Sequence, residues 1–146
     1  MEKSAQSEIL FDDQYLQLYF DPSIKCIVKV WKSPVPEAQF RELIVKLLMQ
    51  IIQTRMKHQN MVINLIADCR NLGSDTFTQE VIDWLNQEVH KIYAMNKIKR
   101  KAFVASNDVM ANMSIVNYIS TNNANAGFEM NIFNSMEDAQ AWVTKE

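Results

Sequence analysis

Apolar residues follow two different periods along this chain, and the alternation of the two constrains the fold more than any other feature. After Pro36, apolar side chains recur every three or four residues, as on a helix packed against a sheet, and the helix should end at about Lys57. Met61 to Ala67 is a nearly continuous apolar run, typical of a strand covered on both faces. The predicted helix carries its apolar stripe on Phe40, Leu43, Ile44, Leu47, Leu48, Ile51 and Ile52.

The same alternation extends over the rest of the chain. Asp21-Pro22-Ser23 separates two alternating runs and predicts a hairpin. Two further strands are predicted over 101–105 and 130–133. Further helices should begin near Thr76, Asp108 and Ser135, where side chains suited to helix capping precede periodic segments.

The resulting order of elements is β-β-α-β-α-β-α-β-α. This order predicts an α/β fold with a mixed, mainly parallel sheet of about five strands and four helices packed on it. The opening hairpin should supply an antiparallel edge. Residues 1–12 are predicted to form a flexible polar lead, and residues 13–146 a single domain.

Composition excludes several classes of protein. The net charge is −2, so no overall positive field favours nucleic acid. We expect no membrane span, because no apolar run approaches the ~20 residues that a bilayer requires. Two cysteines without an export signal predict reduced thiols and a cytoplasmic location. The basic cluster at Lys97, Lys99, Arg100 and Lys101 is interpreted as a solvated connection between a helix and a strand.

The sequence shows no catalytic or metal-binding pattern. Two histidines and two cysteines without short spacing predict no metal site, and no cofactor is expected. Cys69 could act as a nucleophile only with a base beside it. His58 lies at the opposite end of the same strand, and His90 is predicted on the helix face away from Leu85 and Val89.

A polar corner follows the most apolar predicted strand. Ligands in open α/β sheets bind beyond the carboxyl ends of the strands. One reading is therefore a ligand or regulatory site formed by Asp68, Cys69, Arg70, Ser74 and Asn107. The alternative is a structural ion pair between Asp68 and Arg70 that pins the loop to the next helix.

The helix after Asp108 offers a second candidate surface. The pattern predicts that its inward stripe is formed by Met110, Met113, Val116 and Ile119. Ile115 and Tyr118 fall partly off that stripe, and methionines are common at adaptable binding surfaces. A partner surface is therefore predicted at Met110, Met113, Ile115 and Tyr118.

Three segments carry a resemblance to a known family. They are Leu65-Ile66-Ala67-Asp68-Cys69-Arg70, Asp83-Trp84-Leu85 and the ending Phe133-x-Ser135-x-Glu137-x-Ala139-x-x-Trp142. They resemble the central strand, a helix tryptophan and the closing strand and helix of SpoIIAA-like (STAS/SEC14-type) domains. The resemblance implies a sheet of about five strands with helices packed on it.

That resemblance also implies a class of function. STAS domains often act as regulatory modules, and some are switched by phosphorylation of a serine in an Asp-Ser-Ser-Gly turn. This chain has Leu72-Gly73-Ser74-Asp75 in that region, which departs from the motif and leaves Ser74 as the nearest equivalent. The leading hypothesis is a non-enzymatic regulatory or protein-interaction module, binding a protein partner or a second copy of itself. A small-molecule or lipid-binding domain is the alternative, and an enzyme ranks last.

Overall fold

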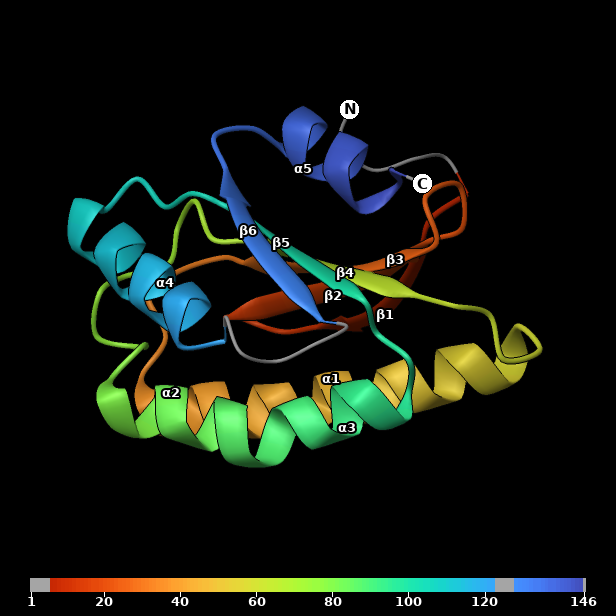
Figure 1. Cartoon of the computed structure of the whole chain (residues 1–146), viewed down its shortest axis with the longest axis horizontal. Helices are drawn as coiled ribbons and strands as arrows, with labels where there is room; N and C mark the ends of the chain where they lie inside the picture. The colour runs from red at the N-terminus through yellow and green to blue at the C-terminus, as the bar shows by residue number, and fades with distance from the viewer. Residues whose placement is uncertain (1–5, 123–127, 146) are drawn as a thin grey trace.

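The computed structural model describes residues 6–122 and 128–145, which form one mixed sheet with helices on both faces (Figure 1). The strands are β1 (Glu8–Asp12), β2 (Leu16–Asp21), β3 (Cys26–Trp31), β4 (Asn64–Asp68), β5 (Arg100–Val104) and β6 (Glu129–Phe133). They lie side by side in chain order. The pairs β1–β2 and β2–β3 are antiparallel, and the three pairs from β3 to β6 are parallel. The predicted mixed α/β architecture is confirmed, with six strands in place of about five.

The helices cover the two faces of the sheet unequally. They are α1 (Glu37–Lys57), α2 (Gln79–Trp84), the π-helical segment η1 (Leu85–Val89), α3 (His90–Met95), α4 (Val109–Thr121) and α5 (Met136–Val143). Because α2, η1 and α3 run on without a break, the described residues form four helical rods. Figure 1 shows α1 beside the α2–α3 rod beneath the sheet, and α5 on the opposite side. Among these helices, none combines the length and apolar character needed to cross a membrane.

Each face of the sheet has its own apolar core. The larger core lies under α1, the α2–α3 rod and α4, and includes Trp31, Phe40, Phe77, Tyr93 and Tyr118. The smaller core lies under α5 and includes Tyr19, Val28, Ile66, Ala102 and Met136. Most of the sheet's apolar side chains therefore face the three-helix side.

The start of the chain corrects the prediction of a polar lead over residues 1–12. Glu8–Asp12 is a strand at the edge of the sheet, paired with β2 and bulged between Ile9 and Phe11. Its Leu10 and Phe11 are half-buried against the larger core. Lys57 Nζ, at the end of α1, lies 3.0 Å from the Glu8 carboxylate. Residues 1–5 of the predicted lead lie outside the described residues.

Turns and helix caps follow the predictions closely. The Asp21 side chain accepts hydrogen bonds from the backbone and hydroxyl of Ser23, which fixes the predicted hairpin turn. Asp108 and Ser135 cap α4 and α5 as predicted. The cap of α2 is Thr78 in place of the predicted Thr76, whose hydroxyl instead donates to the carbonyl of Val35.

Helix α4 faces the sheet with the opposite side from the predicted one. Met110 is 59% exposed and Met113 61% exposed, while Ile115 and Tyr118 are fully buried. Tyr118 packs against Phe77 and Phe103, and its large ring buries more surface than a methionine would. Both sides of α4 are apolar, so periodicity alone could not decide which side faces inward.

Candidate functional site

The polar corner after β4 contains the ion pair that the sequence offered as its structural alternative. Arg70 Nε lies 2.9 Å from Asp68 Oδ1, and Arg70 Nη2 lies 2.6 Å from Asp68 Oδ2. The Arg70 backbone N–H also donates to Asp68 Oδ1. This two-point contact uses both oxygens of the Asp68 carboxylate and fixes the first turn of the loop.

The predicted corner residues do not all come together. Arg70 and Asn107 line a surface hollow of about 310 Å³, whereas Ser74 is not among its lining residues. Cys69 is fully buried in the larger core. Two hydrogen bonds join the loops that line the hollow. Asn107 N–H donates to the Arg70 carbonyl, and Ser106 Oγ donates to the Leu72 carbonyl.

Two lysines lie inside the larger core, and the sequence reading did not anticipate them there. Lys29 on β3 is 1% exposed and Lys101 on β5 is 2% exposed. Their strands flank β4, where Lys29 stands opposite Ala67 and Lys101 opposite Leu65. The two amines lie near enough to influence each other's pKa. We call Lys29 and Lys101 the amine pair.

Aromatic rings surround the Lys101 end of the amine pair. Lys101 Nζ lies 4.8 Å from the ring centre of Phe103, 5.5 Å from that of Tyr118 and 5.6 Å from that of Tyr93. The electron-rich faces of these rings favour an ammonium group over a bare apolar wall. The ion pairs among the described residues include no carboxylate partner for either amine.

His90 and two tyrosine hydroxyls complete this buried polar cluster. His90 Nε2 lies 2.5 Å from Tyr118 Oη, while Tyr93 Oη is buried without a hydrogen-bond partner. The prediction that His90 faces away from the core is wrong. The π-helical turn η1 adds a residue to the helical turn just before His90 and so rotates it inward.

Burial dominates the electrostatics of the cluster. Loss of hydration lowers the pKa of both lysines below the usual range, and their mutual repulsion lowers that of Lys29 further. Burial likewise lowers the pKa of His90 to about 4, and the nearby Lys101 acts in the same direction. It raises the pKa of the Cys69 thiol to about 12, so Cys69 is a protonated thiol and not a nucleophilic thiolate.

A sequence signal for the amine pair did exist. Lys29 alternates with Ile27 and Trp31 on one face of β3, and Lys101 alternates with Phe103 on β5. Residues two apart on a strand share a face, so the pattern places both lysines inward. The prediction of a solvated basic cluster is therefore wrong for Lys101.

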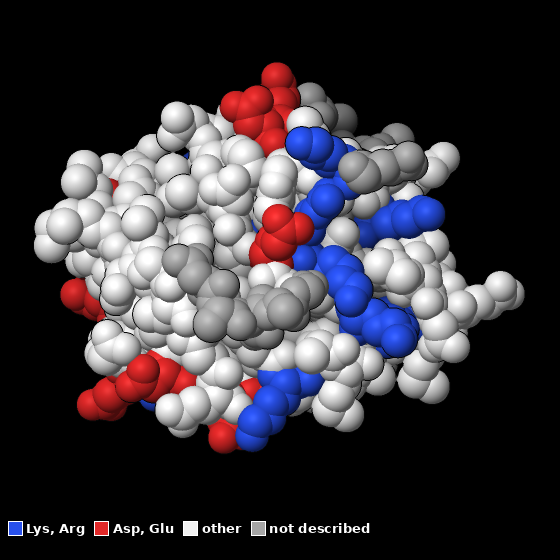
Figure 2. Space-filling view, viewed as in Figure 1, with Lys and Arg blue, Asp and Glu red and all other residues white. Residues whose placement is uncertain are grey.

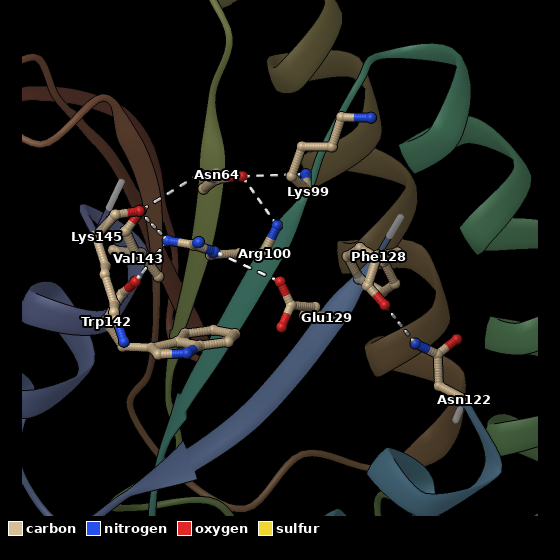
Figure 3. A network of polar contacts seen from close by, with 9 residues as sticks. All are labelled: Asn64, Lys99, Arg100, Asn122, Phe128, Glu129, Trp142, Val143 and Lys145. Carbon is tan, nitrogen blue, oxygen red and sulfur yellow. Dashed lines mark hydrogen bonds and ion pairs between the residues drawn. The ribbon is translucent and has the colours of Figure 1, made fainter. Parts of the chain in front are cut away.

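Arg100, which precedes Lys101 on β5, points to the face of the sheet that α5 covers. Figure 3 shows its guanidinium donating to the carbonyls of Trp142 and Lys145 at the end of α5. It also lies over the Trp142 ring and beside the Glu129 carboxylate. The Asn64 side chain accepts from the backbone N–H groups of Lys99 and Arg100. This network fastens α5 to the sheet.

Helix α4 carries an exposed face without charge. We define the α4 face as Val109, Met110, Met113 and Val116, each more than half exposed. Helix α4 contains no Asp, Glu, Lys or Arg. In Figure 2 the region over α4, at the left, is largely white, while blue and red side chains gather elsewhere. A second exposed apolar stripe lies on α1 at Val45, Met49, Ile52 and Met56.

No group of three or more His, Cys, Asp or Glu that could hold a metal ion occurs within residues 6–122 and 128–145. Comparison with known proteins gives no relative from which a function could be carried over. No family model matches the chain, and neither a curated protein nor a solved structure matches it.

Proposed function

We propose that this chain is a non-enzymatic regulatory module of the SpoIIAA-like type that acts by protein interaction, and that the α4 face binds a second copy of the chain. The observation that carries the proposal is the exposure of four large apolar side chains on a helix without charged residues. Depletion of charge and enrichment in methionine are typical of the centre of a protein interface. The resemblance of the sequence to regulatory domains is a second, independent support.

Self-association suits the α4 face better than binding to a charged partner. In a twofold interface, residues on the axis meet their own copies, so a charge at the centre of the interface meets a like charge. The residues of the α4 face carry none. The exposed stripe on α1 differs, because Lys46, Gln53 and Lys57 are exposed on the same helix.

The α4 face also lies next to the polar corner. Asp108, the cap of α4, lines the hollow together with Arg70 and Asn107. A partner seated on the α4 face would thus have polar groups at its rim, as interfaces commonly do. This arrangement gives the corner residues a role in contact without requiring them to perform chemistry.

The test is the molar mass of the protein in solution, measured by light scattering over a range of concentrations. We expect the wild type to dimerise and Met113→Glu to shift the dissociation constant upward at least about 100-fold, because an unpaired carboxylate resists burial. Met49→Glu on α1 is the matched control, since Met49 is about as exposed as Met113. A wild type that stays monomeric at every concentration, or a dimer disrupted only by Met49→Glu, would overturn the proposal.

A further inference from the structure

We propose that the amine pair is the core of a binding site for a small monoanion, of the size of chloride or formate, inside the three-helix core. The proposal concerns the opposite side of α4 from the interaction surface and does not depend on it. It rests on the hydrogen-bonding character of the groups that meet around Lys29 and Lys101.

The cluster is rich in hydrogen-bond donors. The two amines supply N–H groups, and Tyr93 contributes a hydroxyl that is fully buried and has no partner. Tyr118 Oη is hydrogen-bonded to His90 Nε2, while His90 Nδ1 is buried without a hydrogen-bond partner. A buried hydroxyl without a partner costs stability, and a small anion beside Lys101 would accept from it. The donor set is thus complementary in charge and hydrogen bonding to an anion.

Within residues 6–122 and 128–145, no element packed against the amine pair supplies a negative charge of its own. The buried residues of α1 are apolar apart from Thr54. The rod formed by α2, η1 and α3 contributes His90 and Tyr93, and α4 contributes Tyr118. Cys69 stays protonated because burial raises its pKa. The nearest acidic residue along β4, Asp68, is held by Arg70.

Two small side chains, in and just after β4, lie on the face of the sheet that the two lysines share. Ala67 stands between Lys29 on one side and Phe103 on the other in the register of the sheet. Cys69, two residues further on the same face, is also small. An anion that reaches both Nζ atoms would accept a charge-assisted hydrogen bond from each of them. A second ammonium could then form, so binding should take up a proton.

A pair of buried lysines lowers the stability of the folded state unless a ligand compensates for it. Replacing buried charged groups with apolar residues of similar volume is often neutral or stabilising. Polar groups that lower stability mark functional sites more often than structural ones. A bound anion offsets the cost, because any ligand that binds only the folded state stabilises it.

The experiment measures the melting temperature of the full chain at constant ionic strength as chloride or formate replaces a bulky organic anion. We expect a rise that saturates with concentration, and sulfate at matched ionic strength should give no such rise. Calorimetry in two buffers of different ionisation enthalpy should show proton uptake on binding. Equal rises with all anions, including sulfate, or no rise with chloride and formate, would overturn the proposal.

Two variants of the cluster and one surface control locate the effect. Lys29→Met/Lys101→Met should melt at a temperature that does not change with chloride or formate, while Arg70→Met, at the surface corner, should respond like the wild type. Tyr93→Phe keeps the ring and removes the unpaired hydroxyl, so it should weaken anion binding about 10-fold. If the double variant does not fold, Tyr93→Phe decides alone, and an unchanged affinity in that variant would count against the site.

Discussion

Arg100 and Lys101 are neighbours on β5, yet the protein treats their charges in opposite ways. On the α5 side, Arg100 donates to two carbonyls, covers the Trp142 ring and lies near Glu129 (Figure 3). On the three-helix side, Lys101 is surrounded by aromatic rings, and another buried amine, Lys29, lies on the same face of the sheet.

The comparison distinguishes Arg100, whose charge anchors α5 to the sheet, from Lys101, whose charge the fold does not require. Arg100 supplies donors to the carbonyl of Trp142 in the last turn of α5 and to that of Lys145 just beyond it, where carbonyls lack partners within the helix. Lys101 supplies donors where the surrounding elements offer aromatic faces and few acceptors. Removing the first charge should therefore weaken the fold, and removing the second together with Lys29 should strengthen it.

The largest expected effect is the loss of the Arg100 anchor. Arg100→Met should lower the free energy of unfolding by about 3 kcal/mol, because it removes charged hydrogen bonds to the end of α5 and the contact with Trp142. Urea denaturation at neutral pH measures the change. Lys99→Met, at the exposed neighbouring position, is the control and should change the free energy by less than about 0.5 kcal/mol. A loss as small as in that control would mean that α5 is held by its apolar contacts.

The double variant Lys29→Met/Lys101→Met should change the free energy of unfolding in the opposite direction. We expect the double variant to be more stable than the wild type by about 1–2 kcal/mol at neutral pH in a buffer of bulky anions, because two desolvated amines are replaced by apolar side chains of similar length. Urea denaturation measures the gain. The single variant Lys101→Met, which leaves Lys29 buried alone, should gain less. A double variant less stable than the wild type would show that the amine pair supports the core.

His90 extends the comparison to pH. Burial lowers its folded pKa to about 4, whereas the unfolded value is about 6.5. The unfolded chain therefore binds more protons between these two values, and the free energy of unfolding falls as pH decreases from about 6.5 to about 4. We expect a loss on the order of 1 kcal/mol over that range. Chemical denaturation at several pH values measures it, and His90→Phe should remove that part of the slope.

The extent of a helix was easier to predict than the side that faces inward. The end of α1 was predicted correctly, but Ile52, which was predicted on the inward stripe, is 42% exposed. The orientation of α4 was wrong because Met113 and Val116 form as good a stripe as Ile115 and Tyr118 do. Only the aromatic contacts of Tyr118 with Phe77 and Phe103 decide between them, and these involve three separate elements.

The candidate site was predictable only in part, for a related reason. Asp68 and Arg70 are two residues apart, so their ion pair follows from local geometry. The amine pair unites β3 with β5 across β4, and no local pattern states that neighbourhood. The alternation of apolar residues along each strand places its lysine inward, but the usual preference of lysine for water argues against that position. The inward turn of His90 depends on the π-helical residue, which has no sequence signature of its own.

The smallest expected effect concerns a charge that is paired and exposed. Lys57 Nζ lies 3.0 Å from the Glu8 carboxylate at the edge of the sheet, and both side chains are largely open to solvent. Lys57→Met should change the free energy of unfolding by no more than about 0.5 kcal/mol, because water and salt screen such a pair. The same urea series, repeated at high salt, should give a still smaller difference. A loss approaching that of Arg100→Met would mean that pairing, irrespective of burial, sets the energetic role of a charge in this fold. If Lys57→Met loses little stability and Arg100→Met loses much, the burial of the donor and the number of its acceptors decide how much a charge stabilises this fold.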